Sequence, residues 1–126
     1  MLDKVQEIVR VNDETAEKIA ALRKENERRG KLLEKRMARV AIENVMGRFS
    51  ILYSGGRYRE LMQFFADTEQ ISFQRSDVGV YEGQAAVAGY FANLADHALP
   101  GSFRMMNLTS PVIEMAADGK TAQGMW

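Results

Sequence analysis

The chain has 126 residues, no cysteine, one histidine, His97, and 17 basic against 17 acidic side chains. These counts exclude disulfides, thiolate metal sites and two-histidine metal sites, and a zero net charge gives no reason to expect nucleic acid or an anionic membrane as a partner. Apolar residues make up 46% of the chain and no apolar run reaches the roughly 18 residues that span a bilayer, so we expect a globular, cytoplasmic protein without metal or cofactor.

Residues 1–43 have the composition of a long solvated helix, with 11 of the 17 basic side chains, 9 of the 17 acidic ones and no aromatic residue. Apolar residues recur there in alternating steps of three and four, the spacing of a heptad seam. The seam residues are Leu2, Val5, Val9, Ala16 and Ile19, interrupted by Asn12, Arg23, Asn26 and Gly30, and then Leu33, Met37 and Val40.

This spacing predicts a helix over 2–28, a weak point at Arg29-Gly30 and a second helix over 31–53. The alternative is that Gly30 is a glycine tolerated within one helix, at a cost of about 1 kcal/mol relative to alanine. Residues 1–30 thus form an N-terminal helix, and two interpretations of it stay open. It is either an amphipathic helix that lies on its own domain or a coiled coil that joins two chains.

Residues 31–126 carry the signals of a compact domain with helices and short strands. Gly55-Gly56 ends the long helix, a short helix is expected over 57–66, and alternation predicts a strand near 71–74. A turn at 76–79, a short strand at 80–81 and an alanine-rich helix over 84–98 follow, with Val87, Tyr90, Phe91 and Leu94 facing inward. Pro100-Gly101 then breaks the helix.

The apolar period changes to two after this break. It predicts a strand over 103–110, a second one after Pro111, and a hairpin turn at Asp118-Gly119 that leads into a returning strand ending at Trp126. Such a hairpin has an unpaired edge. We therefore expect that either another chain completes the sheet or these residues begin a longer protein.

The order of these elements resembles the SnoaL-like branch of the nuclear transport factor 2-like superfamily, over residues 34–126. The residues that carry the resemblance are Tyr53–Tyr58, Leu61–Ala66, Gly79–Val87, Phe91, Pro111–Glu114 and Ala117–Trp126. The resemblance implies an α+β fold in which a cone-shaped, curved mixed sheet is packed by helices and encloses a pocket. The family includes polyketide cyclases, scytalone dehydratase and ketosteroid isomerase, but also binding modules without catalysis.

Enzymes of this family hold a small organic molecule in an apolar pocket and move a proton with one or two polar groups. Tyr53, His97 and Asn107 are the candidates for those groups. Each has a structural alternative: Tyr53 as a core aromatic, His97 as a cap of its helix and Asn107 as a solvated strand residue. Asp77 and Arg104 are interpreted as a turn residue and a solvated residue.

The pocket implied by the resemblance would be lined by apolar and aromatic side chains. The candidates for binding the substrate are Phe49, Phe65, Tyr81, Phe91, Met106 and Trp126. The first hypothesis is a cofactor-independent lyase, isomerase or cyclase that acts on a small hydrophobic molecule. The alternative is a non-catalytic ligand-binding or assembly module. In either case we expect a homo-oligomer, formed through the N-terminal helix or the sheet edge.

Overall fold

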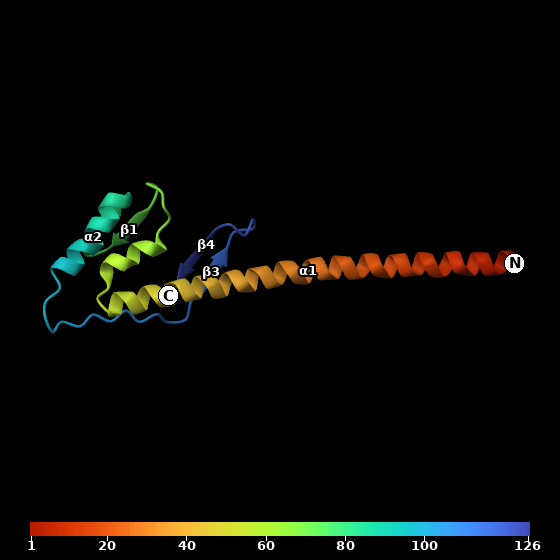
Figure 1. The fold of residues 1–126 in the computed structure, drawn as a ribbon, viewed down its shortest axis with the longest axis horizontal. Helices are drawn as coiled ribbons and strands as arrows, with labels where there is room; N and C mark the ends of the chain where they lie inside the picture. The colour runs from red at the N-terminus through yellow and green to blue at the C-terminus, as the bar shows by residue number, and fades with distance from the viewer.

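The computed structural model describes all 126 residues and has mixed helix and strand content, which confirms the predicted α+β class (Figure 1). In chain order the elements are the helix α1 (Leu2–Ser54), the 3-10 helix η1 (Tyr58–Phe64), the strands β1 (Ser72–Arg75) and β2 (Gly79–Glu82), the helix α2 (Gln84–Asp96), and the strands β3 (Val112–Met115) and β4 (Ala122–Met125).

The long helix α1 is continuous, so the predicted break at Arg29-Gly30 is wrong. Glu25 bridges this part of the helix because it accepts hydrogen bonds from Arg28, at 2.7 and 2.9 Å, and from Arg29, at 3.0 Å. These hydrogen bonds lower the pKa of Glu25, and the bond from Arg28 has the larger effect. A glycine inside a helix costs only about 1 kcal/mol relative to alanine, which is too little to interrupt a helix of this length.

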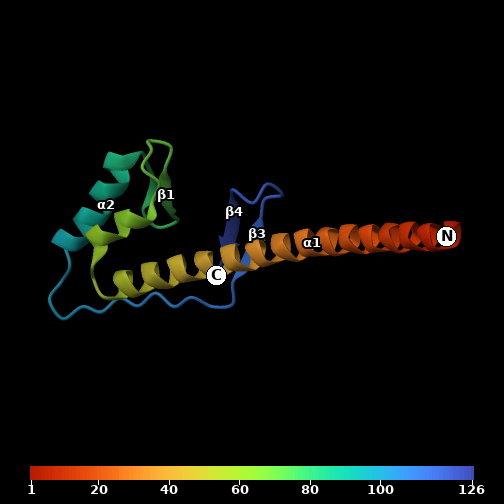
Figure 2. The same cartoon turned by 45° about the vertical axis from the view of Figure 1, so that its right-hand side comes forward.

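The N-terminal half of α1 projects away from the rest of the protein. Residues 1–24 are all exposed, and two views show this part of the helix without any element against it (Figures 1 and 2). The interpretation of residues 1–30 as a helix lying on its own domain is therefore wrong. Only the C-terminal part of α1 packs, through Phe49, Leu52 and Tyr53.

The core is a cluster of aromatic rings between α1, η1, β1, β2 and α2. Nine of the eleven aromatic side chains (six Phe, four Tyr and one Trp) belong to it. Phe91 lies at its centre, fully buried, with four rings at centroid distances of 5.1 to 6.4 Å, those of Phe49, Phe65, Phe73 and Tyr90. Offset and edge-on contacts of this kind add to the burial of apolar area.

The strands form two separate antiparallel hairpins. In the first, β1 pairs with β2, and Phe73 lies opposite Tyr81 at the core. In the second, β3 pairs with β4, and the hairpin lies over residues 31–42 of α1 (Figure 2). Its turn is the predicted one: Gly119 has φ +71°, and the Ala116 amide donates to the Thr121 carbonyl at 2.9 Å.

Residues 103–110 form no strand, so that prediction is wrong. A strand needs a neighbour that pairs with its backbone groups, and this segment has none. Its one tie to a helix is the Met106 amide, which donates to Ser54 Oγ at 3.0 Å at the end of α1. Alternating side chains alone therefore do not make a strand, because no partner strand lies beside this segment.

Phe91→Ala tests the role of the central ring. We expect the free energy of unfolding to fall by about 3–5 kcal/mol, because the substitution empties the centre of the cluster. Phe103→Ala is the matched control: Phe103 is 72% exposed, and we expect a change within about 0.5 kcal/mol. Urea unfolding measures both, and equal losses would contradict the assignment of the core.

Gly30→Ala tests whether α1 is one helix. No atom lies within 4 Å of a side chain added at Gly30, so alanine fits and removes about 1 kcal/mol of helix penalty. We expect the helical circular-dichroism signal to melt at a higher temperature. Gly56→Ala, at a residue with φ +72°, is expected to lower it, because an alanine is strained in that conformation. A hinge at Gly30 would instead leave the melting of the helix unchanged.

Candidate functional site

A cavity of about 310 Å³ opens at the edge of the aromatic core. It lies where the end of α1, the β1–β2 hairpin, α2 and the segment after α2 come together. Its lining residues are Tyr53, Arg75, Asp77, Val78, Tyr81, Tyr90, Asn93, Leu94 and Arg104. We refer to it as the tyrosine–arginine cleft, because three tyrosines and two arginines line it.

Arg75 is held in place from two directions in this cleft. Its Nη1 donates to the hydroxyl of buried Tyr90 at 3.0 Å, and its Nη2 donates to Asp77 Oδ2 at 2.6 Å. The bond to Tyr90 raises the pKa of Arg75; partial burial lowers it by less, and the charge of Asp77 adds a smaller rise. The guanidinium is therefore a fixed positive charge with a defined orientation.

Arg104, in the segment after α2, supplies a second guanidinium to the cleft. It is exposed and forms no ion pair, in contrast to Arg75. Because Asp77 balances only one of the two arginines, the cleft carries a formal excess of one positive charge. An exposed, unpaired guanidinium can bind a carboxylate, a sulfonate or a carbonyl oxygen of a ligand.

The tyrosine rings form the apolar wall of the cleft. Tyr81 and Tyr90 lie with ring centroids 4.7 Å apart, and Tyr53 is edge-on to Tyr58 at 5.4 Å. Tyr90 is buried in the core, whereas Tyr53 and Tyr81 are only half-buried. The cleft thus combines flat aromatic surface with cationic groups, and a guanidinium near such surfaces favours planar anionic or oxygen-bearing molecules.

The local sequence explains how these side chains reach one place. Side chains along β1 alternate, so that Ile71, Phe73 and Arg75 share the inner side. On α2, Tyr90, Phe91 and Leu94 lie at helical spacing on the inner face. Arg75 therefore ends a row of core side chains and meets the hydroxyl of Tyr90, where the core gives way to solvent.

Two of the nine predicted site residues line the cleft, Tyr53 and Tyr81. His97 is exposed at the end of α2, where its Nδ1 lies 3.0 Å from the Asn93 carbonyl of its own helix. Asn107 is exposed in the irregular segment. The structure therefore does not bring Tyr53, His97 and Asn107 together around one cavity.

The other predicted binding residues lie in three places. Phe49, Phe65 and Phe91 belong to the packed core, where their neighbours are other aromatic rings. Met106 is half-buried beside the end of α1. Trp126 lies on the second hairpin with its ring against Gly124, where a Cβ would come within 2.5 Å of the indole.

Sequence reasoning missed the roles of Arg75, Tyr90 and Asn93 in the cleft. The alternation of Ile71 and Phe73 could have indicated Arg75, because the same period places it on the inner side. The burial of Tyr90 was predicted, but not the use of its hydroxyl. Arg104 was interpreted as solvated, and nothing local in the sequence indicates that it lines the same cavity as Arg75.

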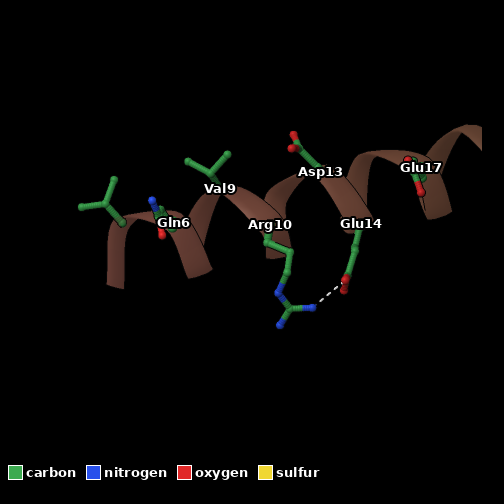
Figure 3. Close-up of a pocket in the computed structure, with 7 residues that line it drawn as sticks. Gln6, Val9, Arg10, Asp13, Glu14 and Glu17 are labelled. Carbon is green, nitrogen blue, oxygen red and sulfur yellow. Dashed lines mark hydrogen bonds and ion pairs between the residues drawn. The ribbon is translucent and has the colours of Figure 1, made fainter. Parts of the chain in front are cut away.

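Four further cavities have no aromatic side chain in their lining. One follows the N-terminal part of α1 and is bounded by that helix alone (Figure 3). Others lie between the second hairpin and residues 31–42. The structure has no group of three or more His, Asp or Glu side chains placed to hold a metal ion. No helix is both long and apolar enough to cross a membrane.

Comparison of the chain with protein-family models, with curated proteins and with solved structures yields no match.

Tyr90→Phe tests the hydrogen bond that orients Arg75. The substitution keeps the ring in the core and removes the hydroxyl, so we expect a loss of about 1–1.5 kcal/mol in the free energy of unfolding. Tyr58→Phe is the matched control, a buried tyrosine whose hydroxyl has no hydrogen-bond partner within the protein, and we expect almost no change. Equal effects in thermal unfolding would contradict the role of the Arg75–Tyr90 bond.

Proposed function

We propose that this chain binds a small, flat, hydrophobic molecule that carries an anionic or carbonyl oxygen, and that it binds it in the tyrosine–arginine cleft. The observation that carries the proposal is the pairing of aromatic surface and an unpaired cation in one cavity, which Tyr53, Tyr81 and Arg104 all line. A volume of about 310 Å³ is at the lower end of the range for small-molecule sites.

We further propose that residues 31–126 are SnoaL-like. The order of elements supports this proposal, since a long helix, a short helix, a hairpin, an alanine-rich helix and a second hairpin follow one another as the resemblance implies. A cone-shaped sheet would require the β1–β2 and β3–β4 hairpins to belong to one curved surface, with additional pairing between them.

The placement of the polar residues favours binding over proton transfer. Tyr53 is the only one of the three proposed catalytic residues that borders the cleft. His97 lies against its own helix end. A lyase, isomerase or cyclase activity would therefore depend on Tyr53, with Arg75 and Arg104 stabilising negative charge on an oxygen of the substrate.

Fluorescence titration with 8-anilinonaphthalene-1-sulfonate tests this proposal. The probe is a flat aromatic anion, and we expect saturable binding that weakens by about tenfold in Arg104→Gln, because a charge-assisted hydrogen bond is lost. Arg48→Gln is the matched control: Arg48 is exposed on α1, outside the cleft, and forms no ion pair. We expect it to bind the probe as the unaltered chain does.

N-phenyl-1-naphthylamine, which lacks the sulfonate, separates the cationic from the apolar contribution. We expect it to bind equally to the unaltered chain and to Arg104→Gln, because the aromatic wall is the same in both. The proposal is wrong if the sulfonate binds both proteins equally, or if neither probe binds saturably.

A further inference from the structure

We propose that α1 pairs with α1 of a second copy of this chain as a parallel, in-register coiled coil. This proposal is independent of the tyrosine–arginine cleft, because it concerns the opposite end and another face of the protein. It is carried by the exposure of the heptad seam, by the face of α1 that the domain leaves free and by the charges that flank the seam.

The heptad seam is exposed along α1. Its large apolar residues at heptad positions a and d have exposed fractions between 45% and 78%, so none of them is covered within the chain. These residues are Leu2, Val5, Val9, Ile19, Leu33, Met37 and Val40. Ile8 and Leu22, at position g beside the seam, are exposed as well and widen the apolar strip, and a strip of this kind is typical of a protein–protein contact. From residue 2 to residue 40 the seam extends for about 57 Å at 1.5 Å per residue.

The domain packs on a different face of the helix. The second hairpin lies over Ala38, Ala41 and Ile42, and the aromatic core contacts Phe49 and the residues beside it. At the same level of the helix the seam residues are still exposed. Positions a and d of the seam are therefore free of intramolecular packing, although the second hairpin borders the e positions Glu34 and Ala41 beside them.

The polar residues of the seam favour a second copy in register over an unrelated helix. Asn12 and Asn26 both occupy position d, so in a parallel, in-register pair each amide meets its own counterpart and can hydrogen-bond to it. Any other register places an asparagine opposite an aliphatic residue. Arg23 then lies opposite Arg23, a like-charge layer that weakens the pair and limits its affinity.

The residues that flank the seam decide the orientation. Position e carries acidic side chains at Asp13, Glu27 and Glu34, whereas position g has none and carries arginine at Arg29 and Arg36. In a parallel pair position g faces position e of the other helix, so Arg29, which pairs with Glu25 of its own helix at 3.0 Å, also comes within reach of Glu34 of the second copy. An antiparallel pair would place e against e and bring the acidic side chains together.

In the N-terminal segment of α1, the side of the helix that carries the seam is separate from the outer, charged face. Val9 and Asp13 point to one side of the helix, whereas Arg10 and Glu14 pair with each other on the other side, at 2.6 Å (Figure 3). Arg10 also pairs with Glu7. These ion pairs keep the outer face solvated within one chain, so that the apolar side is the one left for association.

Single cysteines introduced into this cysteine-free chain test orientation and register directly. Ala16 is at position a and Ala21 at position f of the same helix, on the outer face. In the full chain we expect Ala16→Cys to form a disulfide-linked dimer under mild oxidation and Ala21→Cys to stay largely monomeric on a non-reducing gel, because only residue 16 meets its own counterpart. Crosslinking of Ala21→Cys in preference to Ala16→Cys would overturn the proposal.

Sedimentation equilibrium of the full chain measures the association itself. We expect a dimer whose dissociation constant rises by about a hundredfold in Ile19→Glu, since two carboxylates are then buried against each other. Ala21→Glu places the same charge on the outer face and should leave the dimer unchanged. Both substitutions lie on the exposed part of the helix, so naphthalene-sulfonate binding in the cleft is expected to be unaffected in either.

Three results would overturn the proposal. The first is a monomer at micromolar to millimolar concentration. The second is a dimer insensitive to Ile19→Glu, which would place the interface on the strand edges. The third is a dimer that Ile19→Glu disrupts but Ala16→Cys does not crosslink, which would indicate an antiparallel or shifted pair. Failure of probe binding in the cleft leaves these results untouched, because the two surfaces do not overlap.

Discussion

The packing around Phe91 is the interaction on which the arrangement of this protein depends. Its ring lies on α2 and touches rings from α1, from the segment after η1 and from β1, so one buried side chain fixes elements that are far apart in the sequence. The five buried residues all belong to this cluster, and Phe91, Leu61 and Val87 among them are fully buried. A small domain with so few buried residues gains most of its stability from large aromatic groups, because each buries more apolar area than an aliphatic side chain does.

Filling the interior with rings also decides where a ligand can bind. The centre of the cluster is occupied by its own side chains, and the available space lies at its edge, where Tyr53 and Tyr81 are half-buried. Polar groups gather at the same edge because water or a hydrogen bond must satisfy them. Arg75 meets both conditions: its stem follows the core, and its guanidinium is oriented by Tyr90 and Asp77. The cleft thus lies at the edge of the core, where aromatic packing gives way to polar side chains.

The long helix serves two purposes with two faces. Near its C-terminal end, one face supplies Phe49 and Tyr53 to the core, while the heptad seam on another face stays exposed from the N-terminal end to Val40. This division would let the proposed assembly surface and the proposed binding cleft exist in one small chain without competing for the same residues. Association through α1 would fix the distance between two clefts without covering either of them.

Local patterns in the sequence determined the helices, the β1–β2 and β3–β4 hairpins and the inward face of α2, because each depends on contacts between residues close in the chain. The turn at Asp118-Gly119 is an example, since glycine alone satisfies its positive φ angle. The same local reasoning predicted a weak point at Arg29-Gly30 and a strand over 103–110, and both were wrong. The helix continues because the cost of one glycine is small for a helix as long as α1, and the strand is absent because no partner strand lies beside the segment. The placement of Arg75 and Arg104 around one cavity was decided by the tertiary structure alone, because it required segments far apart in the chain to come together at the edge of the aromatic core.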